Sequence, residues 1–173
     1  MIIYCDGIFD MLHFGHIEHF RKAKNLYDDV FLIVGVNSDE DATGYKRKPI
    51  MNEQTRYDLV ESIKYVDKVI RGSPMVTTRE FIEKHKIDYV VHSFSTPNDL
   101  ANQGDFFDDP RKMGIMKELP YTKGISTTDI INKKLDESCK DWKMIWNKKG
   151  LEEHSPAMLS GYENSDQDPM VTS

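Results

Sequence analysis

The chain has 173 residues, of which 39% are hydrophobic, and its formal net charge is −6. These values predict a globular protein with one hydrophobic core. No apolar run approaches the roughly 20 residues that a transmembrane helix needs, and the N-terminus has no secretory signal pattern, so we expect a cytoplasmic protein without a stable membrane anchor. Every lysine and arginine precedes Gly150, whereas five carboxylates follow it. The preceding part is therefore nearly neutral, and we expect no nucleic-acid partner.

Strand-like and helix-like segments alternate along the first half of the chain. Apolar, β-branched runs predict strands at 2–5, 30–37, 68–70 and 88–92, and helical periodicity lies between them at 16–27, 52–64 and 78–86. This alternation predicts an α/β fold, a Rossmann-like doubly wound parallel sheet with helices on both faces, in a single domain. The run at 30–36 is almost continuously apolar, as expected of a central strand that is covered on both sides.

The regular pattern ends after residue 92. Turn residues punctuate 93–118, a segment so long that we expect it to be functional or disordered. A short strand ending near Leu119 and a closing helix after residue 129 would complete the domain. We therefore expect a folded domain over 1–135, a helical extension over 136–149 and a disordered acidic tail over 150–173.

The junction between the first strand and the first helix carries the motif DGIFDMLHFGH at 6–16. Open α/β sheets bind phosphates at such junctions, where helix N–H groups attract anions. His13 and His16 could both donate to phosphate oxygens during nucleotidyl transfer, and Gly15 would let the phosphates approach the backbone. The structural alternative is that the histidines cap and pack the helix or form half of a metal site, but their motif neighbours Gly7, Phe9 and Asp10 favour the functional interpretation.

Three further segments are candidates for binding phosphate. The cations at 46–48 could close over a triphosphate, or they could form a solvated loop. Arg56, on the predicted polar face of the second helix, could hold a phosphate or form a surface ion pair. Gly124, Ser126 and Thr127 combine a turn, hydroxyl donors and a helix N-terminus, which serves as a cap, as an anion site or as both.

With these motifs, residues 1–135 resemble the HxGH nucleotidyltransferase superfamily and, within it, the cytidylyltransferases that make CDP-alcohols. The similarity is greatest to the choline-phosphate cytidylyltransferases and next greatest to the ethanolamine-phosphate cytidylyltransferases. It rests on the motif at 6–16 together with the segments 23–26, 32–36, 38–40, 51–53, 56–58, 65–67 and 124–128.

The resemblance implies a nucleotidyltransferase that transfers CMP from CTP to phosphocholine, giving CDP-choline and pyrophosphate for phospholipid synthesis. It implies Mg²⁺ bound through the CTP phosphates rather than at a protein metal site. It also implies a homodimer that forms through the region of Tyr65 and Val66, with the cytidylyltransferase catalytic domain over 1–135.

The resemblance also implies roles for individual residues. His13 and His16 would stabilise the transition state, and Lys46 would bridge the phosphates of both substrates. The nucleotide would be bound by Gly7, Ile8, Phe9, Asp10, Gly15, Arg56, Gly124, Ile125, Ser126 and Thr127. The phosphorylated amino-alcohol would meet Met75, His92 and Ser93.

Three positions depart from the family pattern and leave alternatives open. Tyr121 replaces an arginine of the last motif, Met75 stands where choline-phosphate enzymes have a tryptophan, and Ser93 stands where they have an aspartate. The acceptor could therefore be phosphoethanolamine or glycerol 3-phosphate, and an inactive regulatory paralogue that binds CTP is a different class of function. An ATP-dependent transferase fits the motifs less well. The acidic segment after residue 150 predicts no switch that binds anionic membranes.

Overall fold

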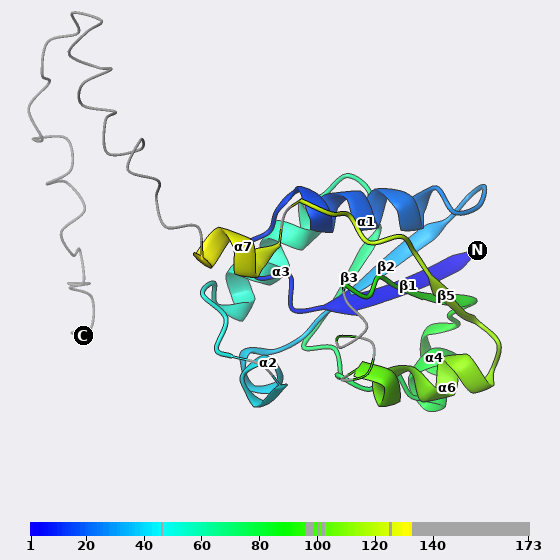
Figure 1. Ribbon diagram of the computed structural model, residues 1–173. Coiled ribbons are helices and arrows are strands. Elements are labelled where there is room, and N and C mark those ends of the chain that lie inside the picture. The colour runs from blue at the N-terminus through cyan, green and yellow to red at the C-terminus, as the bar shows by residue number, and fades with distance from the viewer. Residues whose placement is uncertain (46, 96–98, 100, 102, 125, 133–173) are drawn as a thin grey trace, which may run out of the picture. The chain divides into compact units, whose positions relative to one another are not determined.

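The computed structural model of the protein describes residues 1–45, 47–95, 99, 101, 103–124 and 126–132 (Figure 1). Lys46 and Ile125, the helical extension expected at 136–149 and the acidic tail expected at 150–173 lie outside the described residues. Within the part of the chain that the structure describes, no helix is both long and apolar enough to cross a membrane.

A five-stranded sheet forms the centre of the fold. Its strands are β1 (Ile2–Gly7), β2 (Phe31–Val36), β3 (Lys68–Arg71), β4 (Tyr89–His92) and β5 (Met116–Glu118). They pair in parallel in the order β3-β2-β1-β4-β5, so that Ile3 of β1 lies between Leu32 of β2 and Tyr89 of β4. The direction of winding reverses between β1 and β4, and the crevice outside the carboxyl ends of such strands is where open parallel sheets bind ligands. The predicted Rossmann-like α/β fold is confirmed.

Helices follow the strands and connect them. They are α1 (Phe14–Lys24), α2 (Asp39–Tyr45), α3 (Glu53–Glu61), α4 (Arg79–His85), the 3₁₀ helix η1 (Gly104–Phe107), α6 (Asp108–Lys112) and α7 (Thr127–Asn132). Side-chain caps fix the starts of α3 and α4, because Asn52 accepts the N–H of Thr55 at 2.8 Å and Thr78 accepts the N–H of Phe81 at 3.3 Å.

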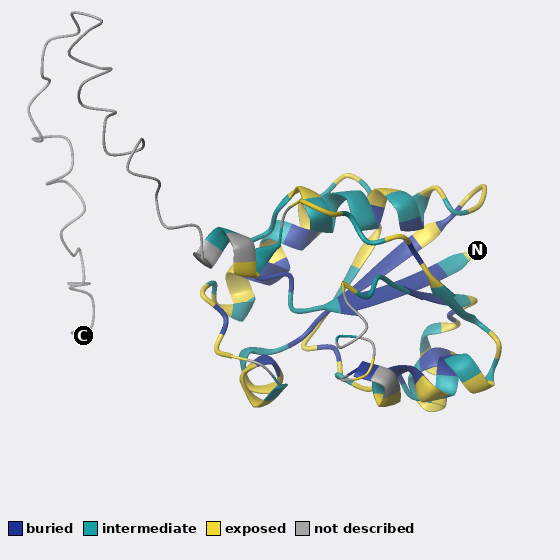
Figure 2. Ribbon diagram, viewed as in Figure 1, coloured by how far each residue is buried: buried dark blue, intermediate teal, exposed yellow. Residues whose placement is uncertain are grey.

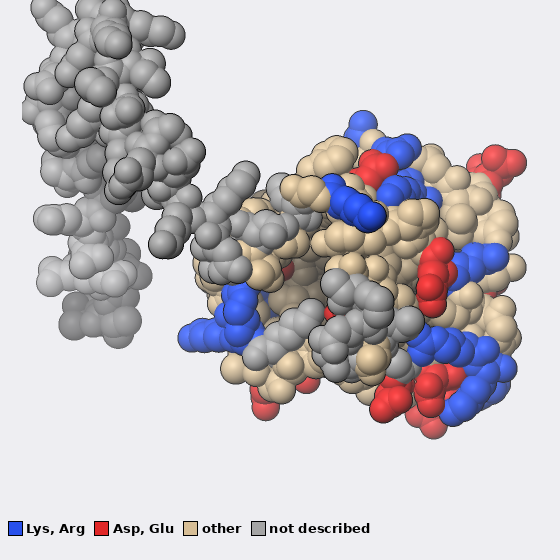
Figure 3. Space-filling model, in the orientation of Figure 1, with Lys and Arg blue, Asp and Glu red and all other residues tan. Residues whose placement is uncertain are grey.

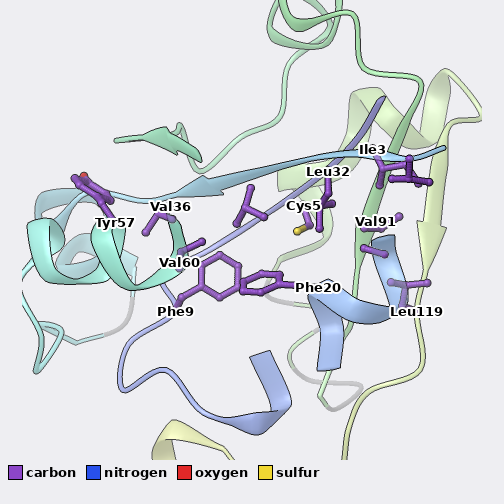
Figure 4. Packing of buried hydrophobic residues seen from close by; sticks show 13 residues of the cluster. Ile3, Cys5, Phe9, Phe20, Leu32, Val36, Tyr57, Val60, Val91 and Leu119 are labelled. Carbon is purple, nitrogen blue, oxygen red and sulfur yellow. The ribbon is translucent and has the colours of Figure 1, made fainter. Parts of the chain in front are cut away.

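Alternate residues of the strands enter two hydrophobic clusters, one on each face of the sheet. Ile3 belongs to the first cluster, with Phe20 of α1 and Val60 of α3 (Figure 4). Its neighbour Tyr4 belongs to the second, with Ile82 of α4. The central strands are consequently the most continuously buried elements (Figure 2). Helices cover both faces, as predicted.

The structure differs from the expected pattern in two places. α1 begins two residues earlier than expected, since the extended His13 caps it and accepts the N–H of Gly15. The segment expected to be irregular contains η1 and α6, anchored by Phe107, which is 1% exposed. These helices span only one or two turns, too few for a detectable periodicity, and Pro110 lies in the first turn of α6, where proline is tolerated.

Candidate active site

A cavity of about 590 Å³ lies where the carboxyl ends of β1 and β4 meet the start of α1. Side chains from α2, from η1 and from the segment between β5 and α7 complete its walls. Most of the predicted site residues line it: Gly7, Ile8, Phe9, Asp10, His13, Gly15, His16, Met75, His92, Ser93, Gly124, Ser126 and Thr127. Residues that are far apart in the sequence therefore meet at the switch point of the sheet.

The two motif histidines form a stacked pair at the start of α1. Their ring centroids are 3.8 Å apart and the rings are inclined by 23°. His13 Nδ1 accepts the N–H of Gly15 at 3.1 Å, so in the neutral ring the proton lies on Nε2, which becomes the hydrogen-bond donor. Phe9 meets the ring of His16 edge-on at 5.3 Å. The helical cap thus fixes one imidazole, and that imidazole and Phe9 enclose the other.

Burial keeps His16 neutral. Loss of solvent, followed by the nearby rings of His13 and His19, lowers its pKa from 6.5 to about 3. At neutral pH this imidazole is therefore a hydrogen-bond donor and acceptor rather than a cation. Its Nδ1 is buried and has no hydrogen-bond partner among the described residues. An unpaired buried nitrogen of this kind is uncommon in folded proteins.

The loop between β1 and α1 is strained, and Asp10 holds it in place. Phe9 and Met11 have φ values of 52° and 50°, in the left-handed region that residues other than glycine rarely adopt. The Asp10 carboxylate accepts the N–H groups of Ile50 and Met51, both at 3.0 Å. Its backbone carbonyl accepts the Thr127 hydroxyl at 2.8 Å. Asp10, predicted as a nucleotide ligand, therefore ties the motif to two other walls of the cavity.

Arg56 lies behind this loop and does not reach the cavity. Its side chain is 0% exposed, so its predicted place on the polar face of a helix is wrong. The guanidinium donates to the carbonyls of Ile8 at 2.5 Å and Met51 at 3.2 Å, and to Asp39 Oδ1 at 2.8 Å. An arginine can be buried when its guanidinium nitrogens donate hydrogen bonds to acceptors on each side. Arg56 thus supports the loop between β1 and α1 from behind.

One wall of the cavity carries a buried carboxylate that the sequence analysis did not single out. Asp6 lines the cavity at the end of β1 and is 7% exposed. Burial raises its pKa from 3.8 to about 7, although its own backbone N–H and the Thr77 hydroxyl oppose the shift. The available signal was a charged residue at the end of an apolar strand. A cation bound beside Asp6 would stabilise its ionised form.

Aromatic side chains stand on the same side of the cavity as Asp6. His92 lies 4.7 Å from the ring of Phe107, and Phe106 meets Tyr45 in a T-shaped contact at 5.2 Å. Met75 also lines the cavity. The wall therefore combines a carboxylate with aromatic faces, which suits an organic cation.

The opposite wall carries a histidine that the sequence analysis also missed. His19 Nδ1 and Ser93 Oγ are 3.0 Å apart and share a hydrogen bond. One turn further along α1, Lys22 donates to the carbonyl of Pro120 at 2.7 Å and to the Thr122 hydroxyl at 3.1 Å, which fixes the approach to α7. The spacing of three from His13 to His16 to His19 was the signal in the sequence, since residues i and i+3 share one helix face.

Comparison with known proteins identifies a family. A family model described as Cytidylyltransferase-like matches residues 4–133. Choline-phosphate cytidylyltransferase A of Rattus norvegicus is 42% identical over 131 residues, which are 76% of this chain and 35% of that protein. Ethanolamine-phosphate cytidylyltransferase of Mus musculus is 37% identical over 136 residues, which are 77% of this chain and 32% of that protein. The chain thus spans about a third of the length of these curated relatives.

A solved structure shares the fold. The lipopolysaccharide core biosynthesis protein from Thermoplasma volcanium GSS1 superposes with a TM-score of 0.56 at 27% sequence identity. The match covers 72% of this chain and 98% of that one.

Proposed function

Because the chain belongs to the cytidylyltransferase-like family, we propose that it transfers CMP from CTP to phosphocholine, forming CDP-choline and pyrophosphate. The observation that carries the proposal is one cavity holding both a histidine pair at a helix start and a buried carboxylate beside aromatic rings. The first feature suits a phosphate under attack, and the second suits a cationic alcohol.

The reaction is an in-line displacement. A phosphate oxygen of phosphocholine attacks the α-phosphorus of CTP, where a new P–O bond forms. The bond from that phosphorus to the oxygen bridging to the β-phosphorus breaks, and pyrophosphate leaves with its electron pair. His13 Nε2–H and the neutral His16 donate to oxygens of the α-phosphate as its negative charge grows. Neither imidazole has to lose a proton in this step.

The remaining phosphates of CTP occupy the wall at the start of α7. Gly124, Ser126 and Thr127 line the cavity there, and Gly124 has a φ of 95°, which favours glycine. Lys46, outside the described residues, is proposed to bridge the two substrates. Magnesium bound through the CTP phosphates would neutralise the leaving pyrophosphate. Its ligands are proposed to be oxygen atoms of the CTP phosphates.

The wall of the cavity that carries Asp6, called the Asp6 wall below, favours a cationic alcohol because of its carboxylate. An ammonium group beside Asp6 would gain a buried ion pair, whereas the uncharged polyol of glycerol 3-phosphate would leave that carboxylate unpaired. Rings from Tyr45 and Phe106 offer faces to a trimethylammonium group. Phosphocholine is therefore the proposed acceptor.

The proposed partners are the two substrates and a second copy of the chain in the cytoplasm. Tyr65 and Val66, near which the dimer is proposed to form, are partly buried against the first hydrophobic cluster. A nucleic acid is not proposed as a ligand. On the face shown in Figure 3, basic side chains are interspersed with acidic ones.

The test is product formation from CTP and magnesium with phosphocholine, phosphoethanolamine or glycerol 3-phosphate in parallel. We expect CDP-choline to be the main product, with kcat/KM for phosphocholine at least tenfold above that for the others. A larger kcat/KM for glycerol 3-phosphate would contradict the assignment of the Asp6 wall. If the chain binds CTP but releases no pyrophosphate with any of the three acceptors, it is a CTP-binding regulator rather than an enzyme.

A further inference from the structure

The two walls of the cavity belong to opposite faces of the sheet. Side chains alternate along β4, so consecutive residues at its end point to different faces. His92 packs against Phe107 of the face covered by η1, whereas Ser93 meets His19 of α1 on the other face. Asp6, two residues after Tyr4 on β1, points to the same face as His92. The end of the sheet therefore separates a wall containing Asp6 from a wall containing His19 and Ser93.

The walls differ in charge. The first carries a carboxylate that a bound cation would ionise. In the second, burial and, to a smaller extent, the neighbouring His92 and Lys22 lower the pKa of His19 from 6.5 to about 3. His19 and Ser93 are therefore an uncharged hydrogen-bonded pair at neutral pH.

We propose that His19 and Ser93 recognise the nucleoside of CTP, with the cationic alcohol on the opposite, Asp6 wall. The inference rests on the proposed function, which requires one cavity to hold two organic groups on either side of the α-phosphate. An ammonium group gains most beside a carboxylate. The ribose and the cytosine carry no charge but offer several donors and acceptors, which match an uncharged polar wall.

The pair is suited to this role because one partner fixes the other. The shared hydrogen bond engages His19 Nδ1 and holds the plane of the ring. Among the described residues, His19 Nε2 has no hydrogen-bond partner, although the side chain lines the cavity. A ring held in this way offers one oriented hydrogen-bonding nitrogen to a ligand at little entropic cost.

The experiment measures binding of CTP and of phosphocholine separately, by titration calorimetry on the full chain, so it needs no turnover. His19→Phe keeps an aromatic ring of similar size and removes both nitrogens. We expect it to raise the Kd of CTP about tenfold, which corresponds to one or two lost hydrogen bonds, and to change the Kd of phosphocholine less than twofold. His85→Phe is the matched control, since His85 lies on α4 and is not part of the cavity lining.

Two further variants test the hydrogen bond between His19 and Ser93 and provide a milder substitution in case His19→Phe does not fold. Ser93→Ala should raise the Kd of CTP about threefold, and the double variant should bind no worse than His19→Phe alone. His19→Gln keeps a donor and an acceptor and should retain an affinity between wild type and His19→Phe. Thermal melting of each variant identifies any that does not fold.

Unchanged CTP binding in folded His19→Phe would overturn the inference. So would a weaker Kd for phosphocholine with an unchanged Kd for CTP, because that result would place the alcohol on this wall. A wild-type chain that binds CTP but releases no pyrophosphate would defeat the proposed function alone, and the CTP titrations would still decide the role of His19.

Discussion

Replacing Arg56 by lysine distinguishes two roles for this residue, which are stabilising the fold around the cavity and binding the nucleotide directly. The guanidinium has no exposed surface and bridges three segments through Ile8, Met51 and Asp39. Lysine keeps the charge, but it is a point donor on a flexible stem and cannot reach three acceptors in different directions. We therefore expect Arg56→Lys to destabilise the fold rather than only to weaken CTP binding.

The magnitude follows from the acceptors that lose their donor. Lysine can satisfy one of the three, which leaves a buried carbonyl unpaired at a cost of about 1–3 kcal/mol and removes a charge-assisted bond worth about 1.5 kcal/mol. Asp39 contributes less, because its side chain is 33% exposed and water can replace the lost partner. The free energy of unfolding should fall by about 3 kcal/mol, measured by urea unfolding followed by circular dichroism.

Arg71→Lys is the matched control. Arg71 pairs with Asp58 and Glu61 while its side chain is 43% exposed, so Arg71→Lys should change the free energy of unfolding far less than Arg56→Lys does. If Arg56→Lys unfolds at the wild-type urea concentration while its Kd for CTP rises tenfold, Arg56 is a direct nucleotide ligand and the reasoning from burial is refuted.

The other predictions concern Asp6 and two glycines. Because the pKa of Asp6 is about 7, lowering the pH from 8 to 6 reduces its ionised fraction from about nine-tenths to about one-tenth, so the Kd of phosphocholine should rise about tenfold in calorimetry. Asp6→Asn should bind weakly at both pH values, and a flat wild-type profile would show that the carboxylate does not bind the acceptor. Gly35→Ala should lower the free energy of unfolding by about 2 kcal/mol, because its Cβ would lie 2.2 Å from Tyr4 Oη. Gly44→Ala in α2 meets nothing within 4 Å and should be neutral or stabilising in the same urea experiment; equal effects of the two glycine substitutions would contradict the close approach.

Local patterns in the sequence were sufficient to predict the fold. The alternation of strands and helices and the continuous apolar run of β2 predict a parallel sheet covered on both faces, and the structure has one. The same reasoning placed the histidine motif at the junction of the first strand and the first helix, and the cavity lies there. The position of each strand, and the residues at which each strand ends, depend on neighbouring residues in the sequence and can therefore be predicted from local patterns.

Long-range contacts could not be predicted in this way. Arg56 is buried because three acceptors from separate segments converge on it, and no local pattern encodes that convergence. The hydrogen bonds that Asp10 accepts from Ile50 and Met51, about 40 positions away, are likewise not encoded by a local pattern. The placement of His92 and Ser93 on opposite faces of the sheet could be predicted, since it follows from the two-residue period of a strand. The contact with His19 could not, because His19 lies 74 residues from Ser93 in the sequence.

The most direct test of the account is the rate of pyrophosphate release with CTP, magnesium and phosphocholine, compared among the wild-type chain, His16→Ala and His85→Ala. The account predicts release by the wild type and by His85→Ala at similar rates, and a loss of at least a hundredfold in His16→Ala without unfolding. Equal rates in His16→Ala and wild type would show that the stacked histidine pair does not carry the transfer.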